Sequence, residues 1–196
     1  MKKFFKVILS TFIIFASLTV YGVHGDDKNL DGGGVIDDPY LINSKEDLTK
    51  MSFLVDSVDG YENAYYKLME DIDMEKVDFT PIGSKRSSSG VLDGSGHAIF
   101  NLEINSTNDQ VGLISFLNGG TVKNLGIESG SIKGGSRTGA LVGRTMYANI
   151  INCYTKADVN GVNDVGGIVG MFNNSTLSNC YVWGNITGSS VTVGGI

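Results

Sequence analysis

Gly139–Gly143, with the sequence GALVG, is followed 27 residues later by Gly166–Gly170, with the sequence GGIVG. This glycine motif begins again at Gly194–Ile196 (GGI). A weaker copy, Gly112–Ser115 (GLIS), aligns with residues 140–143, so the copies recur every 27 or 28 residues. A fixed period of this length indicates a repeat protein, in which each repeat buries its apolar face against the next one.

An asparagine followed by an apolar residue forms a second repeating motif. Asn152 precedes Cys153, and 27 residues later Asn179 precedes Cys180. Apolar residues lie two before and one after each asparagine, and positions three apart face opposite sides of a straight strand, so the chain must turn a corner there. Asparagine tolerates the left-handed backbone of a corner, and amides stacked about 4.8 Å apart can hydrogen-bond between repeats. The predicted corner asparagines are Asn101, Asn124, Asn152 and Asn179.

These two motifs predict an all-β fold, a right-handed parallel β-helix solenoid with rungs of about 27–28 residues and three short walls in each rung. The predicted handedness follows from the strong preference of parallel crossovers for the right hand. One helix is predicted at about 45–57, because Ser44 can cap it and Leu48, Met51 and Val55 follow at helical spacing. We expect this helix to belong to a small α+β cap on the N-terminal end of the solenoid.

The first six residues, MKKFFK, precede an apolar run from Val7 to Val20. A basic start followed by a short apolar run is typical of a signal peptide, and this run is too short for a stable membrane span. We therefore predict a signal peptide at 1–25, a capping region with one helix at 26–98 and β-helix repeats at 99–196. Because the last copy of the glycine motif is cut short, we expect a longer protein that is secreted or held on the bacterial surface, with no membrane span in its mature chain.

Charge and cysteine content restrict the partners and the chemistry. Removing residues 1–25 takes away three lysines and moves the net charge from −6 to −9. An acidic surface repels nucleic acid, so no nucleic-acid partner is expected. Cys153 and Cys180 occupy an apolar core position and are expected to be buried thiols. A disulfide between them is the alternative, because the chain is predicted to be exported and neighbouring parallel strands bring their Cα atoms close. The sequence leaves the oligomeric state open.

The repeat resembles the GLUG motif of bacterial secreted and surface proteins. The resemblance rests on GGIVG at Gly166–Gly170, NCYV at Asn179–Val182 and GNITG at Gly184–Gly188. The segments DPYLI at Asp38–Ile42 and LDGSGHAI at Leu92–Ile99 resemble the region that commonly precedes such repeats. The resemblance implies a β-helix scaffold. It also implies a possible relation to IgA-specific zinc metallopeptidases, which carry such repeats outside their catalytic part.

The sequence contains no recognisable catalytic constellation, so no enzymatic activity is expected of it. A zinc peptidase requires His-Glu-x-x-His, which is absent, and His97 lies in a turn motif where a structural role is expected. Asp71 and Asp73 would share one face of a strand and are the candidate Ca²⁺ ligands. No other metal or cofactor is expected.

Aromatic residues form the candidate ligand-binding surface. Tyr154 and Tyr181 each follow an inward cysteine and therefore face outward, as does Trp183. Exposed aromatic rings stack on sugars or pack against a partner, although aromatic pairs also simply stabilise a sheet.

The prediction is thus a non-catalytic scaffold or adhesion module that contacts a host or cell-surface protein or glycan. The first alternative is the accessory N-terminal region of a secreted hydrolase, such as an IgA-specific-like metallopeptidase. The second alternative is a polysaccharide-acting β-helix enzyme, although no Lys or Arg set recurs at the period of the repeat.

Overall fold

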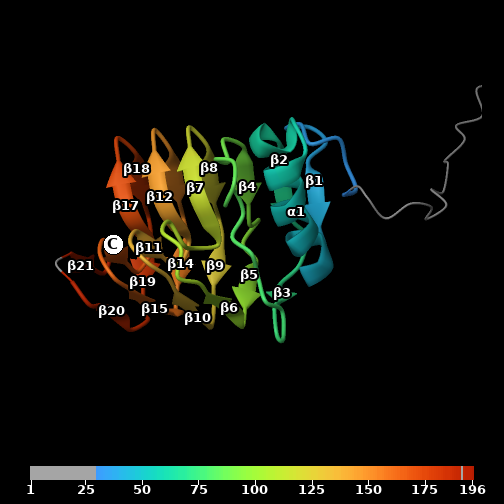
Figure 1. The fold of residues 1–196 in the computed structure, drawn as a ribbon. Helices are drawn as coiled ribbons and strands as arrows, with labels where there is room; N and C mark the ends of the chain where they lie inside the picture. The colour runs from blue at the N-terminus through green and yellow to red at the C-terminus, as the bar shows by residue number, and fades with distance from the viewer. Residues whose placement is uncertain (1–29, 191) are drawn as a thin grey trace, which may run out of the picture.

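The computed structural model describes residues 30–190 and 192–196. The predicted signal peptide lies outside these residues. The described chain is mostly β, as expected, and carries one α-helix near its N-terminal end (Figure 1). Neighbouring strands pair in parallel throughout the five sheets. No helix of the described residues has the length and apolarity to cross a membrane.

The strands form five parallel sheets. The two complete circuits of the chain, from Thr121 to Asn173, visit all five sheets in the same order, and the other circuits visit some of them in that order. We call one circuit a rung and number the sheets in that order. Sheet 1 contains β1 (Tyr40–Ile42), β2 (Tyr65–Leu68), β4 (Val91–Asp93), β8 (Thr121–Lys123), β13 (Asn149–Ile151) and β18 (Thr176–Ser178). Sheet 2 contains β3 (Ile72–Asp73), β5 (Ala98–Phe100), β9 (Gly126–Ile127), β14 (Tyr154–Thr155) and β19 (Tyr181–Val182).

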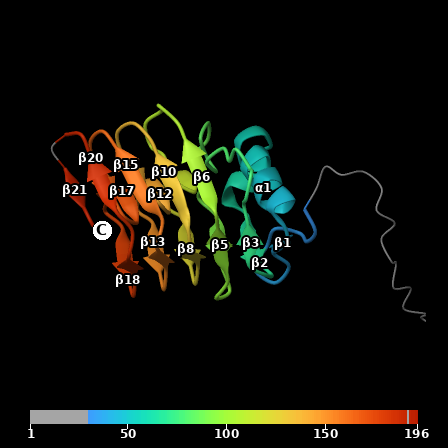
Figure 2. The same cartoon turned by 90° about the horizontal axis from the view of Figure 1, so that it is seen from below.

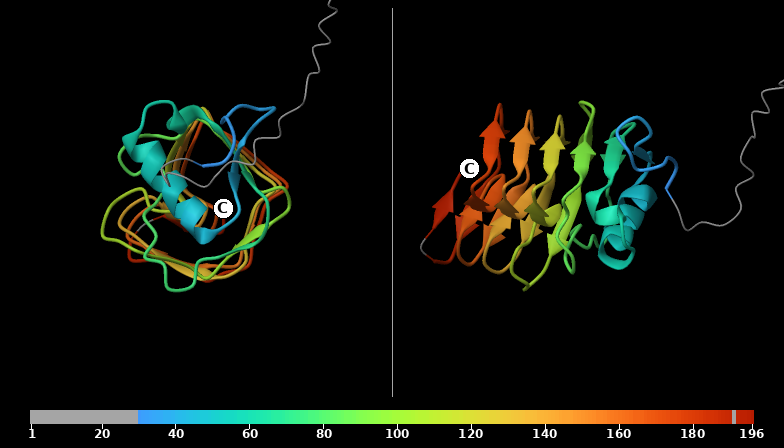
Figure 3. Two further views of the ribbon diagram at one scale, coloured as in Figure 1. Left: turned by 90° about the vertical axis from the view of Figure 1, so that its right-hand side faces the viewer. Right: turned by 90° about the horizontal axis from the view of Figure 1, so that it is seen from above.

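The remaining three sheets are smaller. Sheet 3 contains β6 (Leu102–Asn105), β10 (Gly130–Lys133), β15 (Asp158–Gly161) and β20 (Ile186–Gly188). Sheet 4 contains β11 (Thr138–Gly139), β16 (Val165–Gly166) and β21 (Val193–Gly194). Sheet 5 contains β7 (Ile114–Asn118), β12 (Val142–Met146) and β17 (Val169–Asn173). The views along and across the stack show these rungs lying one behind another (Figures 2 and 3).

The strand register follows the repeat of the sequence. In sheet 1, Val122 pairs with Ile150, and Ile150 pairs with Leu177. These partners are 28 and 27 residues apart, which is the period of the glycine motif. Three walls were expected in each rung, but the strands fall into five sheets, and one of the additional breaks is a bend inside the glycine motif between β11 and β12.

The core lies inside the rungs and is built from columns of equivalent residues. Val122 and Ile150 are fully buried in sheet 1, as is Ile127 in sheet 2. Alternate residues of a strand point to opposite faces, so the neighbours of Val122 in β8 and of Ile150 in β13 lie toward the outer surface. Stacking equal positions at one rung spacing therefore produces a continuous apolar core and a continuous outer wall.

The predicted helix is present as α1 (Lys45–Ser57) and lies across the N-terminal end of the stack (Figure 3). The Ser44 hydroxyl accepts a hydrogen bond of 3.1 Å from the backbone N–H of Asp47. The Asp47 carboxylate accepts one of 3.0 Å from the backbone N–H of Asn43. This reciprocal cap stabilises the first turn, and Leu48 and Met51 bury the inner face of the helix. A short 3-10 helix, η1 (Tyr61–Asn63), follows.

The sheets continue into the segment that was predicted to be a cap. In sheet 1, β2 pairs with β4 and β4 pairs with β8. The predicted boundary between residues 98 and 99 falls inside β5. Residues 30–98 thus supply strands to the same sheets as the repeats, in addition to the helix.

Three asparagines form a hydrogen-bonded ladder at the corner between sheets 1 and 2. Asn124, Asn152 and Asn179 all have a positive φ, of 53° to 54°. The side-chain amide of Asn179 donates to Asn152 Oδ1, and that of Asn152 donates to Asn124 Oδ1, each over 3.0 Å. The amide of Asn124 donates to Asp93 Oδ1 over 3.1 Å, so the carboxylate ends the ladder.

The prediction that Asn101 belongs to this ladder is wrong. Asn101 also has a positive φ, of 53°, but it follows β5 at the corner between sheets 2 and 3. Its amide donates to Asp73 Oδ1 over 2.9 Å, and its Oδ1 accepts from the Ser129 hydroxyl over 3.2 Å. The carboxylate of Asp93 ends the ladder instead, although Asp93 itself pairs in register with Lys123.

The glycine motif is required by close backbone packing, which gives a testable consequence. A Cβ atom on Gly139 would lie 2.6 Å from the carbonyl oxygen of Val142 and 2.7 Å from the backbone nitrogen of Gly170. Backbone atoms of a stacked rung cannot move aside individually. We therefore expect Gly139→Ala to lower the free energy of unfolding by about 1–3 kcal/mol, measured by urea denaturation.

Gly195→Ala is the matched control, because a Cβ atom there would meet nothing within 4 Å. It should change the free energy of unfolding by less than about 0.5 kcal/mol. Equal effects of the two substitutions would contradict this explanation of the motif.

Candidate binding surface

The outer face of sheet 2 carries a column of stacked tyrosines. Tyr154 of β14 pairs in register with Tyr181 of β19. The next residue of β14, Thr155, is fully buried, so the tyrosines face outward as predicted from their positions. Their rings are stacked, with centroids 5.0 Å apart and planes inclined by 3°.

The preceding rung has a glycine in this column. A Cβ atom on Gly126 would collide with the ring of Tyr154, so the ring lies directly over the glycine backbone. Tyr154 is therefore held between Gly126 and Tyr181 and is half-buried, whereas Tyr181 remains 51% exposed. The glycine therefore leaves the room that the ring of Tyr154 occupies.

Trp183 adds a third ring on the same face. Its backbone N–H donates to the Thr155 carbonyl over 2.8 Å, which places it beside Lys156 of the preceding rung. Trp183 is 81% exposed, more than any other large apolar side chain in the described part of the chain. We call Tyr154, Tyr181 and Trp183 the aromatic strip.

An ion pair lies at the edge of the aromatic strip. Lys156 pairs with Glu128, and the Tyr154 hydroxyl donates to Glu128 Oε2 over 2.8 Å. The hydrogen bond from Lys156, and to a smaller extent the one from Tyr154, holds the pKa of Glu128 below its ordinary value. Burial, together with the bond to Glu128, raises the pKa of Tyr154 to about 12. The phenol is therefore neutral at physiological pH, and the two charges beside it are paired.

A carboxylate and an amide follow the aromatic strip along the chain. The backbone N–H and the side-chain amide of Asn185 donate to Asp158 Oδ1, over 2.8 and 2.9 Å. Both residues are exposed, and Asn185 lies two residues after Trp183. Polar hydrogen-bonding groups thus lie next to the exposed ring.

A shallow cavity of about 390 Å³ lies further along the outer surface of sheet 3. Equivalent residues of three rungs, Lys133, Asn160 and Thr187, contribute to its wall. The amide of Asn160 donates to the Thr187 hydroxyl over 2.9 Å. The lining of the cavity contains glycines, hydroxyls and amides but no aromatic ring, so the cavity offers hydrogen bonding without a stacking surface.

The two candidate calcium ligands support different turns. Asp71 Oδ1 accepts from the backbone N–H of Ala98 over 2.9 Å and lies 3.4 Å from His97 Nδ1. Asp73 accepts from the amide of Asn101 and from the backbone N–H of Glu75, and these bonds hold its pKa below the ordinary value. In residues 30–190 and 192–196, no three His, Cys, Asp or Glu side chains are grouped to hold a metal ion.

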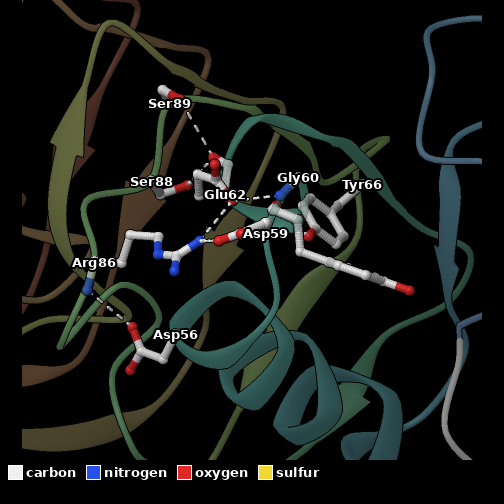
Figure 4. Close-up of polar contacts among 9 residues, drawn as sticks. Asp56, Asp59, Gly60, Glu62, Tyr66, Arg86, Ser88 and Ser89 are labelled. Carbon is white, nitrogen blue, oxygen red and sulfur yellow. Dashed lines mark hydrogen bonds and ion pairs between the residues drawn. The ribbon is translucent and has the colours of Figure 1, made fainter.

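An acidic cluster that was not predicted from the sequence surrounds Arg86 near the end of α1 (Figure 4). Arg86 Nη1 lies 2.6 Å from Asp59 Oδ1 and 3.4 Å from Glu62 Oε2. Asp56 Oδ1 accepts from the backbone N–H groups of Lys85 and Arg86. These contacts hold the loop before β4 against the end of the helix. The three acidic side chains are therefore already paired with groups of that loop.

Both cysteines are free thiols in the structure. Cys153 is buried, whereas Cys180 of the last described rung is half-buried. A hydrogen bond with Cys153 lowers the pKa of Cys180 to about 7, and the same bond together with burial raises the pKa of Cys153. The two thiols therefore differ, and the more acidic one, Cys180, is the more exposed to solvent.

Comparison with known proteins supports the family resemblance. The family model of the GLUG motif matches residues 134–160, so the predicted motif is confirmed for this segment. No curated protein matches the chain.

One solved structure is similar over most of the chain. It is described as a putative immunoglobulin A1 protease from Bacteroides ovatus. The match has a TM-score of 0.68 and 25% sequence identity, and it covers 79% of this chain and 50% of that one. The chain therefore spans about half the length of the structure that it resembles.

The ion pair at the aromatic strip has a testable pH dependence. Because the pKa of Glu128 is lowered in the folded state, its stabilising effect is present above its ordinary pKa of 4.5 and is lost as the pH falls through the lowered value. Lys156→Met removes the hydrogen bond that contributes most to lowering the pKa of Glu128. The substitution should therefore move this pKa upward toward 4.5, measured by NMR titration of the side-chain carboxyl carbon.

Lys123→Met is the matched control, since it breaks another ion pair, with Asp93 at 3.1 Å. It should leave the pKa of Glu128 unchanged. A Glu128 pKa that responds equally to both substitutions would refute the assigned cause.

Proposed function

We propose that this chain is an exported, non-catalytic scaffold that attaches to a partner on a cell surface through the aromatic strip. Its fold, on this proposal, is a right-handed parallel β-helix. Strands that pair in parallel with the strand one rung earlier support the helix, and the general preference of parallel crossovers supports the right hand. The GLUG motif supports a place in a secreted or surface protein.

A non-catalytic role is supported by the way in which the candidate chemical groups are used. Asp71 accepts a hydrogen bond from the backbone N–H of Ala98 and faces His97. Asp73 accepts a hydrogen bond from the side-chain amide of Asn101. Asp71 and Asp73 thus each stabilise a turn between strands. Groups that hold the backbone in this way are committed to the fold and not to the activation of a substrate.

The observation that carries the proposal is the exposure of Trp183 on a rigid wall. An exposed indole is unfavourable in water, and such rings mark binding surfaces when they gather in a patch. Trp183 lies beside the stacked pair of Tyr154 and Tyr181, and its backbone is hydrogen-bonded into sheet 2. The stacked tyrosine pair is already ordered and the backbone of Trp183 is held in the sheet, so a ligand that binds there loses less conformational entropy than it would on a mobile loop.

The second candidate function is an accessory region of a secreted hydrolase, such as an IgA-specific-like metallopeptidase. The similarity to the structure described as a putative immunoglobulin A1 protease favours it. In that case the chain would contact the substrate of the hydrolase and not a cell. Immobilised immunoglobulin A1 would then retain the purified protein without being cleaved, which the leading proposal does not expect.

Trp183→Ala provides the direct test of attachment. We expect the substitution to weaken attachment of the purified, fluorescently labelled protein to cells about tenfold, which corresponds to about 1.4 kcal/mol. Attachment is measured by flow cytometry on bacterial and epithelial cells. The fold should be retained, because the side chain contributes little to the core.

Phe53→Ala is the matched control, since Phe53 is a 65% exposed aromatic residue on α1, outside sheet 2. It should leave attachment unchanged. The proposal fails if the unsubstituted protein does not attach to either kind of cell, or if the two substitutions weaken attachment equally.

A further inference from the structure

We infer that the ligand of the aromatic strip is a neutral glycan, one sugar ring of which stacks on Trp183. The inference rests on the proposed function, because it names the ligand class of the same surface. Three features of the surface point to this class: its area, the geometry of its rings and the polar groups beside them.

The exposed area is small for a protein partner. Trp183 is 81% exposed and Tyr181 is 51% exposed, which together offer on the order of 300 Å² of ring surface. A stable protein interface needs about 800 Å² from each partner. Polar residues lie next to the rings, namely Lys156, Asp158 and Asn185. A flat ligand of a few rings fits this area.

The ring geometry suits the apolar face of a sugar. The face of an aromatic ring carries negative electrostatic potential and attracts the slightly positive C–H groups of a pyranose. Tyr181 is held parallel to Tyr154 within 3°, so its orientation is fixed before a ligand arrives. Trp183 lies two residues further along the same outer face. Two rings at successive outward positions offer stacking surfaces for adjoining sugar units.

The polar groups beside the rings match sugar hydroxyls. Asp158 accepts both bonds from Asn185 through Oδ1, and its second carboxylate oxygen lies on an exposed side chain. A carboxylate that accepts and an amide that both donates and accepts can bind neighbouring hydroxyl groups of one sugar. A few hydrogen-bonding groups beside an apolar platform are the usual composition of a small-ligand site.

The charge of the surface favours a neutral ligand over an acidic one. The cation at the strip, Lys156, is ion-paired with Glu128, and Asp158 adds a negative charge nearby. The whole chain carries a net charge of −6. An anionic glycan would be repelled by this field, whereas the binding of a neutral one is insensitive to it.

The experiment uses Trp183 as its own reporter, because it is the only tryptophan in the sequence. Glycans released from the cells that bind the protein are separated by anion exchange into neutral and acidic fractions. Tryptophan emission of the full chain is then titrated with each fraction. We expect saturable quenching or a blue shift with the neutral fraction and no change with the acidic one. Tyr181→Ala should weaken the response about tenfold, and Phe53→Ala should not alter it.

A second arm distinguishes the ligand class from the proposed function. Cells are treated either with periodate, which cleaves the vicinal diols of sugars, or with a protease, and attachment is measured for the unsubstituted protein and Trp183→Ala. Loss of Trp183-dependent attachment after periodate but not after protease supports the glycan. Attachment that survives periodate and is lost after protease overturns the glycan and leaves the proposed function standing. A response to the acidic fraction alone, or to neither fraction, also overturns the inference, whereas failure to attach to untreated cells overturns the proposed function itself.

Discussion

In-register parallel pairing between rungs is the constraint on which the rest of the structure depends. Val122, Ile150 and Leu177 are hydrogen-bonded neighbours at about 4.8 Å, although 27 or 28 residues separate them along the chain. Each position must therefore be compatible with its own copies above and below. An apolar residue repeated inside builds the core, whereas an asparagine repeated at the corner builds a ladder of amide bonds. A glycine repeated at the position of Gly139 leaves room for the backbone of the next rung.

The same constraint explains the outer surface. The stacking that places Cys153 under Cys180 inside also places Tyr154 under Tyr181 outside, one residue further on. The candidate binding surface is thus a consequence of the repeat and of its local departures. Gly126 interrupts the tyrosine column and accommodates the ring of Tyr154, and Trp183 replaces the lysine of the preceding rung.

Much of the architecture could be predicted from the sequence, because the repeat period transfers directly to strand register. The helix at 45–57, the parallel strands and the outward tyrosines all follow from local patterns. The position of Asn101 did not, because the longer loop after Asp93 shifts the first rung out of the period. The contacts of Glu128 and Asp158 were also missed, since each partner lies on another rung and neither residue recurs in the repeat.

The most direct test of the stacking constraint is the deletion of one whole period, residues 153–179, which joins Asn152 to Cys180. Because Asn152 and Asn179 occupy equivalent positions, every remaining strand keeps an in-register neighbour. Thermal unfolding followed by far-UV circular dichroism should then show a β spectrum and one cooperative transition. Deletion of residues 153–165 joins Asn152 to Gly166 and so brings Gly167 and Ile168 of the glycine motif into the positions of β14 in sheet 2, which should abolish that transition. Equal loss of structure in both proteins would contradict the in-register stack of rungs.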